Sequence, residues 1–148
     1  MTAFKPLAHS DIEQVVSMMQ DFYAIDNYPI EVDSAKKLFE EFITNENLGR
    51  AWLIYNEEEI VGYVILTFVF SFEYKGRIAF LDELYLSEKA RGKGIGKKTI
   101  NFIQAQAQEL KLKVLYLEVE NHNEKAQKLY FKNNFTVHNR KLMKYTVV

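Results

Sequence analysis

The chain has 148 residues, of which 48% are hydrophobic and 26% are charged, and its formal net charge at pH 7 is −1. This length and composition predict a single globular domain over residues 1–148, and the balanced charge gives no indication of a nucleic-acid partner. The absence of cysteine excludes disulfides and thiolate nucleophiles and is compatible with the reducing cytoplasm, where we expect the protein to act. The first residues lack the apolar core of a signal peptide, and no apolar run is long enough for a membrane span, so no membrane partner is expected.

The first half of the chain predicts an edge strand, two helices and three strands. The apolar residues between Ile12 and Phe22 and those between Leu38 and Ile43 have helical spacing. Runs rich in β-branched and aromatic residues, separated by polar turns, predict the strands. The predicted strands are Phe4 to Leu7, Ala51 to Tyr55, Ile60 to Phe72 and Ile78 to Leu86.

The second half predicts alternating helices and strands. Gly94 to Leu110 and Asn123 to Lys132 are predicted helices, and the second ends before Asn134, a residue that tolerates a left-handed stop. The predicted strands are Val114 to Val119, Phe135 to His138 and Leu142 to Val147. The complete order, β-αα-βββ-α-β-α-ββ, indicates a mixed α/β domain with a largely antiparallel sheet and one parallel crossover.

A basic, glycine-rich segment lies between the predicted strand ending at Leu86 and the helix that follows. Its residues are Arg91, Gly92, Lys93, Gly94, Ile95, Gly96, Lys97 and Lys98. Such a turn directs backbone N–H groups and the positive end of a helix dipole toward an anion, and a pyrophosphate suits it. A Walker A loop fails because Arg91 and Lys98 replace its glycine and its hydroxyl residue, and the dinucleotide motif fails at Lys97.

The segment resembles the coenzyme A loop of the GNAT superfamily of acyl-CoA-dependent N-acyltransferases. The pattern (Gln/Arg)-x-x-Gly-x-(Gly/Ala) is matched by Arg91, Gly94 and Gly96. The strand before it, Phe80 to Leu86, and the later segment Leu117 to Phe135 also resemble family motifs, and the element order agrees over nearly the whole chain. Asn134 departs from the glycine usual in the family, but asparagine tolerates a left-handed backbone.

The resemblance implies a cofactor, acetyl-CoA, and residues that bind it, with no metal. The backbone of Leu84, Tyr85 and Leu86 would pair with the pantetheine arm, and the loop from Arg91 and Gly92 through Lys93, Gly94, Ile95 and Gly96 to Lys97 would hold the pyrophosphate. Asn123 would contact the arm, and Tyr130 would protonate the departing thiolate. The three histidines show no metal-ligand spacing.

Transfer to an amine also requires removal of a proton, because a free alkyl amine is mostly protonated at pH 7. Asp82 and Glu83 lie on the strand before the loop, and alternation points them to opposite faces unless a bulge intervenes. In related polyamine and some aminoglycoside acetyltransferases, the position matching Asp82 carries a catalytic acid. The sequence leaves open whether Asp82, Glu83 or water takes the proton.

The acceptor is expected to be a small-molecule amine. Tyr23, Tyr28, Phe72 and Tyr74, together with Asp82, fall where the family builds its acceptor pocket, and aromatic side chains with carboxylates suit an organic cation. Two alternatives stay open at this point: a protein acetyltransferase acting on lysine or an N-terminus, and a non-catalytic acyl-CoA-binding domain. Homodimers are common in the superfamily, and the sequence does not decide the oligomeric state.

Overall fold

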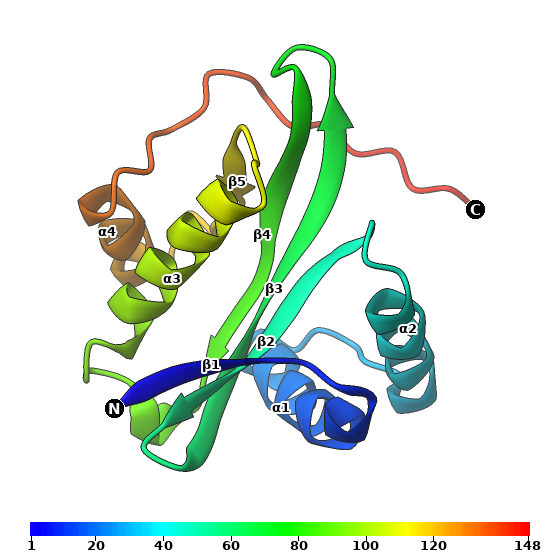
Figure 1. Ribbon diagram of the computed structural model, residues 1–148, viewed down its shortest axis with the longest axis vertical. Coiled ribbons are helices and arrows are strands. Elements are labelled where there is room, and N and C mark those ends of the chain that lie inside the picture. Colours follow the sequence, from blue (N-terminus) through cyan, green and yellow to red (C-terminus); the bar gives the residue numbers. More distant parts are fainter. The chain divides into compact units, whose positions relative to one another are not determined.

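A computed structural model describes residues 1–148, which divide into two compact units, Met1–Glu118 and Val119–Val148. The first unit contains a five-stranded sheet and three helices (Figure 1). Its elements are β1 Thr2–Pro6, α1 Ile12–Ile25, α2 Val32–Thr44, β2 Gly49–Asn56, β3 Glu59–Ser71, β4 Gly76–Leu86, α3 Ile95–Glu109 and β5 Leu115–Leu117, with 3₁₀ turns at His9–Asp11 and Glu88–Ala90. The expected single domain over the whole chain stays a prediction.

The sheet has the strand order β1-β2-β3-β4-β5, and β4 and β5 form its parallel pair. The other neighbouring strands are antiparallel. The crossover from β4 to β5 runs through α3, as expected for a parallel connection. The predicted mixed α/β architecture is therefore confirmed.

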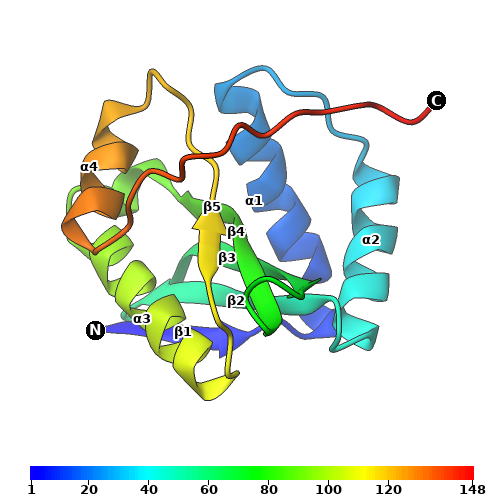
Figure 2. The ribbon, with the colours of Figure 1, turned by 90° about the horizontal axis from the view of Figure 1, so that it is seen from above.

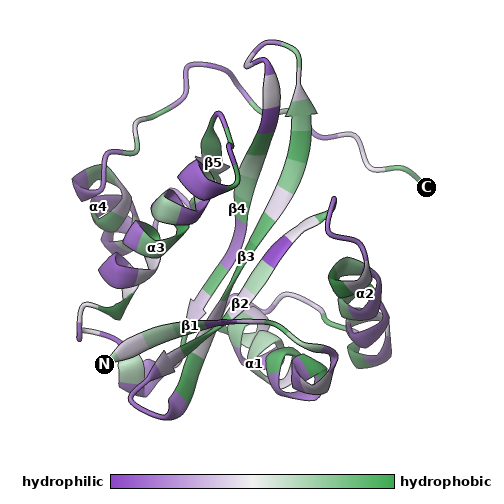
Figure 3. Ribbon diagram, in the orientation of Figure 1, coloured by the Kyte–Doolittle hydropathy of each residue, from purple (hydrophilic) through white to green (hydrophobic).

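The two faces of the sheet are covered by different helices. Leu53, Tyr63 and Ile65 face a core that α1 and α2 complete, with Val15 and Phe39 among its buried members (Figure 2). On the opposite face Phe102 of α3 stacks on Phe4, with ring centroids 4.1 Å apart, and meets Trp52 edge to face. Apolar residues run along the strands, and the helices carry both apolar and polar residues (Figure 3). Burial of these apolar surfaces on both faces provides the main stabilisation of the sheet.

The second unit contains α4, Glu124–Lys132, followed by chain without secondary structure. Asn134 has φ 72°, so the predicted left-handed stop is confirmed. The two predicted strands over 135–138 and 142–147 are wrong, because neither segment pairs with another strand. The alternation of apolar and polar residues in these two segments is not sufficient to make them strands. A strand forms only when a partner strand supplies hydrogen bonds. The large apolar side chains at Leu142, Met143 and Tyr145 are instead exposed.

Candidate active site

A β-bulge in β4 determines which way the two predicted carboxylates point. Glu83 pairs with Ile65 of β3, whereas Leu81 pairs with Leu66, so Asp82 is the extra residue. In a regular strand Leu81 and Glu83 would share one face, but here their partners are consecutive residues that point to opposite faces. The bulge therefore turns Glu83 to the face covered by α1 and α2, the face of Ile65.

The Glu83 carboxylate is held by two tyrosines from different elements. The Tyr23 hydroxyl, on α1, donates to Oε2 at 2.6 Å, and the Tyr63 hydroxyl, on β3, donates to Oε1 at 2.7 Å. Burial raises the pKa of Glu83, as does the nearby charge of Asp82, while the two hydroxyls oppose this by stabilising the ionised form. Burial and the Glu83 charge also raise the pKa of both tyrosines, so the phenols remain donors at neutral pH.

The Asp82 carboxylate lies beside this cluster in a different environment. The charges of Glu83 and Asp82 both raise the pKa of the Tyr23 hydroxyl. The pKa of Asp82 is raised, first because its carboxyl is partly removed from water and second because Glu118 lies nearby. Two adjacent carboxylates with raised pKa values, one held by donors and one without them, form an arrangement suited to proton transfer.

The glycine loop has a left-handed backbone at two of its glycines. Gly92 and Gly94 both have φ 77°, and a Cβ placed on either would meet no atom within 4 Å. Gly94 is the residue that precedes α3, and no side chain caps the helix there. The first N–H groups of α3 are consequently available to a ligand. The Ile95 side chain is buried in the core, so this residue contributes only its backbone to the loop.

Basic side chains surround the same loop. Arg91, Lys93 and Lys97 are exposed, and the first turn of α3 contains no acidic residue. The Arg91 Nε donates to the Leu86 carbonyl at 3.1 Å, which ties the loop to the end of β4. Gly96 lies in the first turn of α3, where a side chain would hinder close approach of an anion. Open space, free N–H groups and positive charge together fit a pyrophosphate.

The end of β4 has one paired and one open edge. Leu84, Tyr85 and Leu86 pair with β3, but β5 pairs only with Ala79–Leu81. Within residues 1–118 no strand therefore covers the other edge of β4 from Asp82 onward. An extended polar chain can add to such an edge through main-chain hydrogen bonds. This edge begins at the carboxylates and ends at the glycine loop, and its contact with a pantetheine arm stays a prediction.

Asn123 and Tyr130, the two predicted residues of the second unit, both have defined local roles. The Asn123 side chain accepts from the Ala126 N–H at 3.1 Å and so caps α4. The Tyr130 ring packs edge to face on Phe135, and burial raises the pKa of its hydroxyl. Their contacts with coenzyme A stay predictions.

The predicted acceptor residues are dispersed. Tyr28 lies in the loop after α1 and is exposed. Phe72 lies in the β3–β4 turn, 89% exposed and packed on Phe70, about 20 Å along β4 from Glu83. The Tyr74 hydroxyl shares a hydrogen bond of 2.7 Å with that of Tyr116. The structure thus does not bring Phe72 to the carboxylates.

Tyr63 is the residue of this cluster that sequence reasoning missed. Its position within an apolar run favoured a simple core residue, and its side chain is indeed only 1% exposed. The signal lies in the register, because Tyr63 and Glu83 come together only once the bulge is known. Tyr23, by contrast, was associated with the acceptor region from the sequence.

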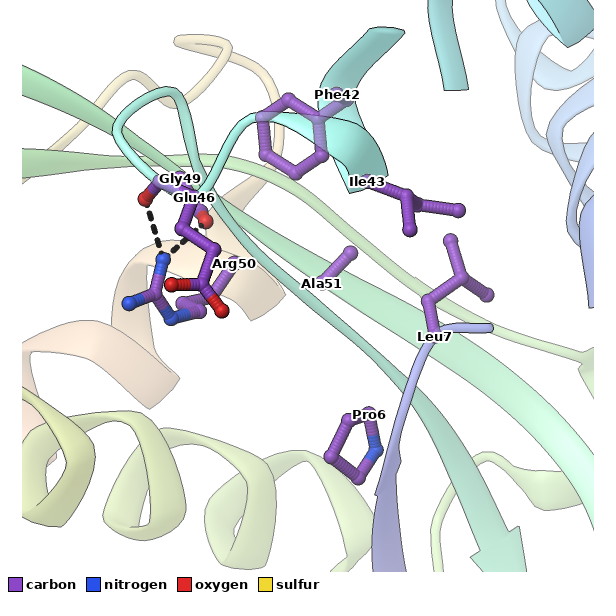
Figure 4. A pocket seen from close by; sticks show the side chains of 8 residues that line it. All are labelled: Pro6, Leu7, Phe42, Ile43, Glu46, Gly49, Arg50 and Ala51. Atoms are coloured by element: carbon purple, nitrogen blue, oxygen red, sulfur yellow. Dashed lines mark hydrogen bonds between the residues drawn. The ribbon is translucent and has the colours of Figure 1, made fainter. Parts of the chain in front are cut away.

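A separate cavity of about 160 Å³ lies between α2 and the start of β2 (Figure 4). Arg50 turns back there to the carbonyls of Glu46 and Gly49, and none of the predicted site residues lines the cavity. The structure contains no group of three or more His, Asp or Glu side chains placed to hold a metal, and none of its helices is long and apolar enough to span a membrane.

Comparisons with solved structures found proteins of similar fold. A solved integron cassette protein from a salt-marsh metagenome is 28% identical, with a TM-score of 0.88, and the match covers 98% of this chain and 90% of that one. A predicted acetyltransferase from Clostridium acetobutylicum, solved with acetyl-CoA, is 17% identical, with a TM-score of 0.81 and coverage of 98% and 96%. The second likeness, at its low identity, shows the fold alone.

A curated relative is similar over a shorter stretch. The D-amino-acid N-acetyltransferase HPA3 of Saccharomyces cerevisiae is 38% identical over 55 residues, which is 37% of this chain. The chain spans only 34% of the length of that relative.

A match to a family model identifies the class of protein, an acyltransferase. The model of the acetyltransferase (GNAT) family matches residues 13–135. The chain belongs to this family of acetyltransferase enzymes, whose fold uses acetyl-CoA.

Proposed function

We propose that the protein transfers the acetyl group of acetyl-CoA directly to a primary amine of a small molecule. The observation that carries this proposal is the arrangement along β4, where the bulge with Asp82 and Glu83 leads through an open edge to the glycine loop. The strand β4 would thus connect the groups that accept the proton with the loop that binds the donor. The proposal includes action in the cytoplasm, which a cysteine-free chain suits.

The glycine loop and the open edge of β4 would hold the donor. The N–H groups at the start of α3 and the basic side chains at Arg91, Lys93 and Lys97 would contact the pyrophosphate. The backbone of Leu84 and Leu86 would pair with the pantetheine arm. Acetyl-CoA supplies an activated acyl group that an amine can attack without a covalent acyl-enzyme, in keeping with a chain that lacks cysteine.

The carboxylates at the bulge would prepare the amine. An ammonium group is attracted to negative charge, yet it must lose a proton before its nitrogen can attack the acetyl carbon. The pair Asp82 and Glu83 accepts that proton, and Tyr130 returns one to the sulfur as the carbon–sulfur bond breaks. The raised pKa values of Asp82 and Glu83 support their role, since a stronger base takes a proton from an ammonium group more readily.

The acceptor is a small amine in this proposal because the carboxylates are accompanied by tyrosines in a partly buried setting. Tyr23 and Tyr63 enclose Glu83, and aromatic faces next to carboxylates favour small organic cations. Tyr74, through Tyr116, is a further candidate to line the acceptor site.

The test is acetyl-CoA turnover, measured as released thiol, across polyamines, aminoglycosides, free amino acids and lysine peptides. The proposal predicts turnover with at least one class of small amine and loss of that turnover in Asp82→Asn. Glu58→Gln, an exposed change in the β2–β3 turn, is the matched control and should behave like wild type. Turnover confined to peptides would indicate a protein acetyltransferase, and acetyl-CoA binding by calorimetry without any turnover would indicate a binding domain.

A further inference from the structure

The contacts around the bulge distinguish the two neighbouring carboxylates. Both oxygens of Glu83 are engaged by hydroxyl donors, whereas the Asp82 carboxylate makes no hydrogen bond or ion pair. We propose that Tyr23 and Tyr63 are positioning residues that hold the Glu83 carboxylate in a fixed orientation, so that Asp82 is the carboxylate left free to take the proton of the amine. This inference rests on the proposed acetyl transfer.

Tyr63 is positioned rigidly by the sheet and its aromatic neighbours. Its ring is buried, lies 5.8 Å from the ring of Tyr85 and meets Phe22 edge to face at 6.4 Å. A ring enclosed in this way has little freedom to turn its hydroxyl elsewhere. Because Tyr63 and Glu83 also belong to neighbouring paired strands, the sheet fixes the distance between them.

Tyr23 connects the same carboxylate to the helix layer. It lies on α1, its ring contacts Phe22 at 6.1 Å, and its hydroxyl bonds to the oxygen that Tyr63 leaves open. Three elements, α1, β3 and β4, therefore meet at Glu83. Because both of its oxygens already accept hydrogen bonds, the Glu83 carboxylate has little freedom to turn toward an amine.

The charges that surround the pair favour Asp82 as the base. Glu83 faces Tyr23 from α1, Tyr63 from β3 and Asp82 from its own strand. Asp82 faces Glu118, at the end of β5, and has no donor to stabilise its ionised form. Tyr85, which faces Tyr63, is itself influenced by Asp21, Arg91 and Glu88. Among these groups Arg91 carries the only positive charge, so neither carboxylate is neutralised by a cation.

This difference has a direct chemical consequence. Hydrogen bonds to an ionised carboxylate weaken it as a base, because they favour the form that has already lost its proton. Asp82 lacks such bonds, and its partial burial, followed by the nearby charge of Glu118, strengthens it as a base. A base without competing donors can approach an ammonium group through either oxygen. In the transfer the proton moves from the amine nitrogen to a carboxylate oxygen of Asp82 as the nitrogen–carbon bond forms.

The first experiment follows the carboxyl groups directly and needs no turnover. Carboxyl carbons of Asp and Glu are observed by ¹³C NMR through a pH titration of the wild type, Tyr23→Phe and Tyr63→Phe. Removal of either hydroxyl is expected to raise the pKa of Glu83, because the ionised form loses a donor. The matched control is Tyr55→Phe, because Tyr55 lies on β2 and packs against the same core as Tyr63. This change should leave the titration of Glu83 unchanged. An unchanged Glu83 titration in both Tyr23→Phe and Tyr63→Phe overturns the positioning role.

The second experiment uses the accepted amine and separates the two carboxylates. Asp82→Asn is expected to lower kcat by roughly 100-fold or more with little change in the KM for acetyl-CoA, as for the loss of a general base. In Tyr63→Phe the acidic limb of kcat/KM should not move to higher pH, because that limb reports the ionisation of Asp82, whereas the lost hydroxyl acts on Glu83. Loss of turnover in Glu83→Gln with retained turnover in Asp82→Asn overturns the assignment. If the wild type acetylates no amine, the transfer itself fails, and the NMR titration still judges the positioning role separately.

Discussion

The two ends of the functional part of β4 differ in charge, in burial and in how they are built. The glycine loop after the strand is basic and exposed, and it presents backbone groups that local conformation alone makes available. The carboxylate cluster at the bulge is acidic and partly buried, and it depends on side chains from α1, β3 and β4. An anion-binding loop can thus be encoded in a few consecutive residues, whereas a proton-transfer site requires tertiary structure.

If the two regions have these separate roles, substitution of a carboxylate should reduce activity more than any other change. Asp82→Asn keeps the size of the side chain but removes the base, so kcat is expected to fall by roughly 100-fold or more. Acetyl-CoA affinity should remain near wild type, because the glycine loop is untouched. Steady-state kinetics combined with calorimetric binding of acetyl-CoA checks both halves, and a parallel fall in affinity would contradict the separation of roles.

A change in the glycine loop should instead weaken the binding of acetyl-CoA and leave proton transfer intact. Gly94→Ala forces a side chain into the left-handed backbone at φ 77°, at a cost of about 1–2 kcal/mol in stability. Because the Cβ also enters the space where an anion would lie, KM for acetyl-CoA should rise while the proton-transfer step is spared. Gly94→Asn tolerates the backbone but still fills the space. Equal affinity for acetyl-CoA in Gly94→Asn and the wild type would show that the loop does not bind it.

Loss of one tyrosine hydroxyl should have a moderate effect on stability. Tyr63→Phe leaves Glu83 with one donor instead of two in a partly buried position. A destabilisation of about 1–3 kcal/mol is expected for a buried polar group that loses a partner. Urea unfolding at pH 7 measures it, with Tyr55→Phe as the control. Equal stability of Tyr63→Phe and the wild type would mean that water replaces the hydroxyl at no cost.

The smallest effect concerns the dependence of stability on pH. Asp82 has a raised pKa in the folded state, so the folded protein binds more protons than the unfolded chain between the two pKa values. Stability therefore falls as pH rises through this window, and the charged group costs stability above it. Asp82→Asn should slightly raise the melting temperature at pH 7, and the gain should vanish below the unfolded pKa. A gain that is the same at both pH values would require another cause.

Most of the fold could be predicted because the local patterns were strong. The hairpins, the helices and the parallel crossover follow from apolar periodicity and polar turns, and the left-handed Asn134 follows from its side chain. The strands expected after α4 did not form, because alternation cannot specify a pairing partner. A local sequence pattern describes one strand, but the hydrogen bonds of a sheet also require a second strand beside it.

The candidate site was predictable only in part for a similar reason. Gly92 and Gly94 carry their conformational preference in their own chemistry, so the loop was evident. The sequence left the orientation of Asp82 and Glu83 open, because a bulge depends on the register between β3 and β4. The contact of Tyr63 with Glu83 spans 20 residues of sequence, and no local pattern indicates it.

The central claim is that acetyl groups reach an amine. The most direct measurement is mass spectrometry of the amine after incubation with acetyl-CoA and the protein, with the released thiol quantified in the same sample. The account predicts an acetylated small amine in equal amount to the thiol, and near-background product with Asp82→Asn. Thiol release without any acetylated amine, or undiminished acetylated product with Asp82→Asn, would contradict it.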